Sequence, residues 1–121
     1  SSPQVIVVAL GTNDFATGNV GPAFIGDYVA LIQRLRHAYP SAQIFGVFGG
    51  MLAGERYKAG RDAVSAAIAR LQEAGDGRVH FIEFDLPDTS RRWGCDWHPG
   101  LGAQQHMART LQTQISQYEA W

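Results

Sequence analysis

The chain has 121 residues, which is enough for one domain with a modest buried core. Apolar residues make up 45%, charged residues 17%, and the formal net charge is −1, so neither a nucleic-acid-binding surface nor a basic membrane-binding surface is expected. No apolar run is long enough to cross a bilayer, and the single cysteine, Cys95, cannot form a disulfide within the chain.

Three apolar runs, at residues 5–10, 43–48 and 79–84, indicate strands that are covered on both faces. Residues 11–22 are polar and rich in glycine, which favours a loop. Apolar side chains at helical spacing predict one helix after this loop, one after the second strand and one near the end of the chain. They are Phe24, Tyr28, Leu31, Ile32, Leu35 and Tyr39, then Val64, Ile68 and Leu71, then Met107, Leu111, Ile115 and Tyr118.

A strand followed by a helix, three times over, predicts an α/β fold: a three-layer sandwich with a parallel sheet and right-handed crossovers. Such sheets bind ligands beyond the carboxyl ends of their strands. Three segments fall at that edge: LGTND at residues 10–14, a loop at residues 49–56, and CDWHPG at residues 95–100. We therefore expect a functional site where these segments meet.

His98 is the candidate general base of that site, because an imidazole takes up and returns protons near neutral pH. Pro99 restricts the backbone of His98 to extended conformations. Asp96 lies two residues earlier, and in an extended stretch its carboxylate would point to the same side and orient the ring through Nδ1. This pair suits acyl transfer from an ester, which also needs a nucleophile.

Asn13 can offer its side-chain amide to a developing oxyanion, and Gly11 lets the chain turn sharply after the first strand. An asparagine in a glycine-rich segment is also a common turn former, and Asp96 could equally be a turn or capping residue. Trp93 and Trp97 suit either stacking on sugar rings or plain packing.

Metal and nucleotide chemistry have weaker support in the sequence. Cys95, Asp96, His98 and His106 form one irregular cluster without the paired ligand spacing of zinc sites. There is also no glycine-rich phosphate-binding motif, which disfavours an NAD- or phosphate-binding domain. We therefore expect no metal and no cofactor.

The two strings together resemble the SGNH, or GDSL-type, hydrolase family, whose four blocks provide Ser, Gly, Asn and His. Gly11-Thr12-Asn13-Asp14 is similar to the GxND block, and Asp96-Trp97-His98-Pro99 to the block that carries the acid and the histidine. The resemblance covers essentially the whole chain. It implies a flavodoxin-like fold, with Asn13 and Gly11 in the oxyanion hole and His98 and Asp96 as catalytic residues.

In most of that family the acid precedes the histidine by three residues, and here it precedes by two. This form is similar to the carbohydrate esterases of family 2, such as acetyl xylan esterases. The resemblance implies removal of acetyl or short acyl groups from a carbohydrate, with Trp97 and Trp93 as substrate-binding residues and a secreted or periplasmic location. Some members of that group work as Ser–His dyads, in which case a backbone carbonyl near Trp97 would hold Nδ1 instead of Asp96.

The serine and glycine blocks of the family are not found in this chain. The family sheet has the strand order 2-1-3-4-5, so residues 1–121 are expected to be the C-terminal part of one catalytic domain, holding only strands 3, 4 and 5. The strand at residues 5–10 is too apolar for an exposed edge. We therefore expect an upstream segment or a second chain to supply the serine. A non-catalytic α/β domain that binds a glycan or a protein partner is the alternative.

Overall fold

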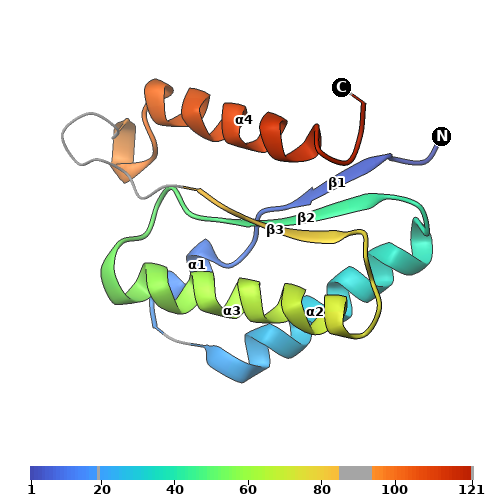
Figure 1. The fold of residues 1–121 in the computed structure, drawn as a ribbon. Helices are drawn as coiled ribbons and strands as arrows, with labels where there is room; N and C mark the ends of the chain where they lie inside the picture. The colour runs from blue at the N-terminus through green and yellow to red at the C-terminus, as the bar shows by residue number, and fades with distance from the viewer. Residues whose placement is uncertain (19, 85–93, 121) are drawn as a thin grey trace.

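The computed structural model describes residues 1–18, 20–84 and 94–120. Strands and helices alternate along these residues (Figure 1). The elements are β1 (Val5–Val8), α1 (Thr12–Ala16), α2 (Gly21–Ala38), β2 (Gln43–Phe48), α3 (Gly54–Glu73), β3 (Val79–Glu83), the 3-10 turn η1 (Cys95–Trp97) and α4 (Leu101–Ile115). None of these helices is long and apolar enough to cross a membrane.

The described strands form one parallel sheet in the order β1-β2-β3. β2 lies in the middle, since its Ile44 pairs with Ile6 of β1 and with Val79 of β3. Helices α1, α2 and α3 lie on one face of the sheet, and α4 lies on the other (Figure 1). The prediction of a three-layer α/β sandwich with a parallel sheet is confirmed.

β2 is buried along its whole length because its side chains alternate between two cores. Ile44 and Phe48 belong to the core beneath α2 and α3. Phe45 and Val47 point to the other face and belong to the core beneath α4, which includes Ile115. This arrangement explains why the sequence of β2 is continuously apolar instead of alternating with polar residues.

β1 is an edge strand, and among the described strands only β2 pairs with it. Its residue Val7 is 40% exposed, and Leu10, just beyond the strand, is 50% exposed. An apolar edge with free backbone donors and acceptors readily accepts another strand. β1 therefore offers a surface on which the sheet can be extended.

Some boundaries differ from the sequence-based prediction. β1 ends at Val8, β3 ends at Glu83, and α1 occupies Thr12–Ala16 where a loop was expected. α1 buries only Phe15, so five residues leave no helical period to detect. Tyr118 was expected on the last helix, but α4 ends at Ile115 and Tyr118 lies beyond it.

Arg36 joins three segments at the amino-terminal edge of the sheet, opposite the predicted site. Its guanidinium donates to both carboxylate oxygens of Asp76, at 2.9 and 3.1 Å. It also donates to the carbonyl oxygens of Ala42 at 2.6 Å and Arg78 at 3.2 Å. The end of α2 is thereby tied to the chain just before β2 and just before β3.

Arg36→Ala is expected to lower the free energy of unfolding by about 2 kcal/mol, because charged hydrogen bonds are lost and partly buried acceptors are left unpaired. Chemical denaturation measures the change. Arg34→Ala, which removes an exposed arginine of the same helix, is the matched control and should stay within about 0.5 kcal/mol of the parent chain. Equal effects of the two substitutions would contradict a structural role for Arg36.

His80 of β3 is half-buried under the C-terminal segment. Its ring stacks on Tyr118 with centroids 3.8 Å apart, and its Nε2 lies 2.8 Å from Gln43 Oε1. Burial lowers the pKa of His80 from its ordinary value, while the Asp76 carboxylate acts in the opposite direction and Arg36 acts in the same direction. The folded chain therefore favours the neutral imidazole.

This lowered pKa predicts acid-sensitive stability. Below about pH 6.5 the unfolded chain takes up the proton before the folded chain does, so stability is lost as the pH falls through the folded pKa of His80. We expect the free energy of unfolding to fall from about pH 7 toward pH 5, and His80→Gln to flatten this slope. Denaturation curves across this range measure it, and His37→Gln on the exposed face of α2 should leave the slope unchanged.

Candidate active site

The segments that follow β1 and β2 and the one that precedes α4 meet at the carboxyl edge of the sheet. There they enclose an open hollow of about 350 Å³, lined by residues 9–14, Met51 and His98. We call it the site hollow. The structure thus brings Gly11 and Asn13 together with His98, as their places at one sheet edge predicted.

Gly11 shapes the first wall of the site hollow. It is buried and has a φ of 115°, a left-handed conformation that favours glycine. A Cβ atom there would lie 3.1 Å from Phe24 Cζ and 3.3 Å from Phe48 Cε2. The sharp turn leads directly into α1, where Asn13 and Asp14 are exposed beside the hollow.

Phe15 packs α1 against α2. Its side chain is fully buried, and its ring meets the Phe24 ring edge-on with centroids 5.0 Å apart. This aromatic pair contributes on the order of 1 kcal/mol beyond its burial. Asn13 therefore lies on a short helix that the buried Phe15 side chain holds in place, and not on a free loop.

His98 has an extended backbone, with φ −78° and ψ 154°, as the following proline requires. Its Nδ1 lies 2.9 Å from the backbone carbonyl oxygen of Asp96. A carbonyl oxygen only accepts hydrogen bonds, so Nδ1 donates and Nε2 carries the lone pair. The imidazole is thus held in the tautomer that a general base needs.

The expected contact of the Asp96 carboxylate with Nδ1 is not what the structure shows. Residues 95–97 form a 3-10 turn rather than an extended stretch, so the i and i+2 side chains do not point the same way. Asp96 itself has φ 55° and ψ 44°. Its carbonyl oxygen, not its carboxylate, therefore faces the histidine ring.

Met51 lines the site hollow and was not singled out by the sequence reasoning. It follows Gly50, whose φ is 94° and where a Cβ atom would lie 2.7 Å from Met107 Sδ. This close approach packs α4 against the segment that follows β2, and it sets the position of the backbone at Met51. The only sequence signal was its position directly after Gly49-Gly50, at the end of a predicted strand.

Only one of the two tryptophans proposed for substrate binding lies among the described residues. Trp93 lies outside the described residues, and Trp97 belongs to η1. Cys95, also in η1, is a free and exposed thiol. Within residues 1–18, 20–84 and 94–120, no group of three or more His, Cys, Asp or Glu side chains is arranged to hold a metal ion.

A family model described as the GDSL-like Lipase/Acylhydrolase family matches residues 1–106. The chain belongs to this family. The resemblance to GDSL-type hydrolases that Gly11-Thr12-Asn13-Asp14 and Asp96-Trp97-His98-Pro99 indicated is therefore confirmed.

This GDSL-like family member is 38% identical over 120 residues to the Cellulase/esterase CelE of Acetivibrio thermocellus, over 98% of this chain and 15% of that protein. It is 30% identical over 126 residues to an Acetylxylan esterase / glucomannan deacetylase of Cellvibrio japonicus, over 95% of this chain and 33% of that protein. A solved family two carbohydrate esterase from Clostridium thermocellum, in complex with cellohexaose, matches with a TM-score of 0.92 and 38% identity.

The match to that solved structure covers 96% of this chain and 36% of the other. The GDSL-like chain therefore spans 15% and 33% of the two curated relatives and 36% of the solved esterase. The similarity to family two carbohydrate esterases, expected from the short spacing of Asp96 and His98, is confirmed.

Proposed function

We propose that this chain supplies the general base and an oxyanion donor of a carbohydrate esterase that removes acetyl groups from a glycan. The observation that carries the proposal is that Asn13 and His98, far apart in the sequence, line the same site hollow. The hydrogen bond from His98 Nδ1 to the Asp96 carbonyl oxygen supports the assignment of the base, because it leaves Nε2 free to accept a proton.

In the proposed reaction, His98 Nε2 takes the proton of a serine hydroxyl as the serine oxygen attacks the acetyl carbonyl carbon. The Asn13 amide donates to the carbonyl oxygen as it becomes an oxyanion. The imidazolium then returns its proton to the sugar oxygen, the ester bond breaks, and an acetyl-serine remains. A water molecule then attacks the carbonyl carbon of the acetyl-serine, and His98 Nε2 takes its proton. The imidazolium returns that proton to the serine oxygen as acetate leaves.

We propose that the serine comes from a segment outside this chain that also carries the glycine block and pairs with β1. None of the described residues that line the site hollow is a serine. β1 is an apolar edge strand whose carboxyl end leads directly to Gly11 and Asn13. A parallel strand on that edge would end beside the site hollow, where a nucleophile is needed.

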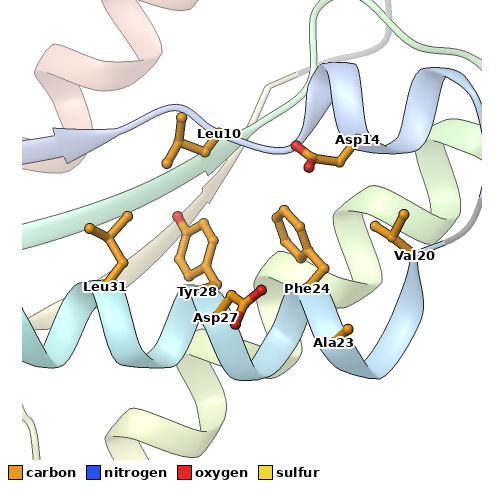
Figure 2. A pocket seen from close by; sticks show the side chains of 8 residues that line it. All are labelled: Leu10, Asp14, Val20, Ala23, Phe24, Asp27, Tyr28 and Leu31. Atoms are coloured by element: carbon orange, nitrogen blue, oxygen red, sulfur yellow. The ribbon is translucent and has the colours of Figure 1, made fainter.

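An apolar groove beside β1 supports this placement (Figure 2). It has a volume of about 300 Å³, with Phe24, Tyr28 and Leu31 pointing from α2 toward β1 and α1. The Tyr28 hydroxyl lies 3.4 Å from the Val8 carbonyl oxygen, and burial raises the pKa of Tyr28 well above its usual range. A segment paired with β1 would cover this groove and the exposed side chain of Leu10.

The carbohydrate substrate is proposed from the relatives. One is named a cellulase/esterase, another an acetylxylan esterase and glucomannan deacetylase, and the solved esterase binds cellohexaose. Trp93 and Trp97 are proposed to contact the sugar, since aromatic rings present a flat apolar face with a polar edge.

The experiment compares the 121-residue chain with the complete enzyme, meaning this chain together with the segment that carries the serine. Release of acetate from acetylated xylan and from an aryl acetate is measured for both. The complete enzyme is expected to be active, and the chain alone inactive. Turnover by the pure chain that His98→Ala abolishes would show that the nucleophile lies within these residues.

Glycan binding without catalysis is a second candidate, because the active site of one related solved carbohydrate esterase displays divergent catalytic and non-catalytic binding functions. Calorimetry with cello- and xylo-oligosaccharides tests it on the complete enzyme. Binding with no acetate release from any acetylated glycan would favour this candidate over the esterase.

A further inference from the structure

Met51 is the one half-buried apolar side chain among the described residues that line the site hollow. Ala9 and Leu10 lie on the β1 side of the hollow and are exposed, and Gly11 presents no side chain. An apolar ligand group gains most where it is removed from water. The sheltered apolar wall of the site hollow is therefore the one that Met51 forms.

The segment that carries Met51 is packed against two neighbouring elements. A Cβ atom at Gly50 would lie 3.9 Å from Cγ of Pro99, the residue that follows the proposed base. A Cβ atom at Gly49 would lie 2.5 Å from the Phe84 carbonyl oxygen at the end of β3. Both glycines have a positive φ, 94° and 124°, which allows these close approaches. The wall is thus fixed relative to the histidine turn and to the sheet.

In the proposed reaction, the groups on the ester carbonyl carbon take different directions in the hollow. The carbonyl oxygen faces the Asn13 amide, and the serine arrives from the open edge of β1, where Leu10 is exposed. The sugar is large and hydroxylated, so it needs an open path to water. The acyl chain is small and apolar, so its burial is favourable. These requirements place the acyl chain against Met51.

We propose that Met51 limits the length of the acyl group, so that the esterase prefers acetyl over longer acyl groups. The inference rests on the proposed function, in which Asn13 and His98 act on the ester carbonyl, and it adds a wall of defined size on the acyl side. A shorter side chain at residue 51 should widen the range of accepted acyl groups, and a bulkier one should narrow it.

Three substitutions change this wall in the complete enzyme, and kcat/KM is measured for an aryl acetate and the matching aryl butanoate. Met51→Ala should raise the butanoate-to-acetate ratio about tenfold, because two further methylene groups gain apolar contact in the space that is freed. Met51→Phe should lower the ratio about threefold, because it fills that space. Met51→Leu nearly conserves the volume and should keep the ratio within about twofold of the parent.

A ratio of two esters on one enzyme preparation does not depend on how much of the chain is folded. A merely structural role of Met51 would therefore lower both rates and leave the ratio unchanged. Leu101→Ala removes an exposed leucine of α4 that does not line the site hollow, and it is the control that should keep the ratio. Acetylated xylan and the aryl acetate carry the same acyl group on different leaving groups, so their ratio tests for a contact of Met51 with the sugar.

An unchanged butanoate-to-acetate ratio in both Met51→Ala and Met51→Phe would overturn the inference while the parent enzyme still releases acetate. A change confined to the ratio of acetylated xylan to aryl acetate would also overturn it, since the sugar would then lie against Met51. A parent enzyme that releases no acid from any of these esters would refute the proposed function itself, and the inference with it.

Discussion

His98→Ala in the complete enzyme is expected to lower kcat about 10³- to 10⁴-fold. Without the imidazole, the serine proton loses the acceptor that His98 Nε2 provides as the bond to the acetyl carbon forms. KM should change little, because the ring acts mainly on the transition state. Initial rates with an aryl acetate and with acetylated xylan measure the effect.

The control for His98→Ala is His37→Ala, which removes an exposed histidine of α2 outside the site hollow and should leave kcat unchanged. Far-UV circular dichroism of both variants checks that the fold is kept. A loss of less than about tenfold for His98→Ala would contradict its role as the base.

Asn13→Ala is expected to lower kcat about 10²- to 10³-fold, which is the usual cost of removing one oxyanion donor. The loss arises because the negative charge on the carbonyl oxygen is then stabilised by fewer fixed donors. Burial of Phe15 holds α1 in place in the variant, so the effect is on chemistry and not on folding. The measurement is kcat and KM on the aryl acetate.

Asn13→Asp sharpens this test, since it keeps the shape of the side chain and replaces a donor by a negative charge. It should be at least as inactive as Asn13→Ala. Thr17→Ala, at the exposed C-terminal end of the same helix, is the matched control and should retain full activity. If Asn13→Asp kept the parent rate, Asn13 could not face the oxyanion.

The sheet and the three long helices could be predicted because each carries a repeated signal. β2 was predicted to the residue, since its continuous apolar run reflects burial on both faces. α1 could not be predicted, because its stability comes from the contact of Phe15 with Phe24, which lies on another helix. A tertiary contact of this kind leaves no periodicity in the local sequence.

The site was predictable as far as chain order and sheet topology determine it. Asn13 and His98 follow from the rule that ligands bind at the carboxyl edge of parallel strands. The contact at Nδ1 did not follow, since it depends on the left-handed backbone of Asp96. Sequence patterns report which side chains are present, and they carry little information on which way a single carbonyl points.

The Arg36 network ties the amino-terminal edge of the sheet, whereas His98 lies at the opposite edge at the end of a short turn, and its side chain is exposed. Segments with fewer buried contacts open at lower free energy than the rest of a fold. On warming, the turn at residues 94–98 should therefore open before the sheet melts. The esterase activity of the complete enzyme should then be lost at temperatures below its melting temperature. It should return on cooling, because the sheet has not unfolded.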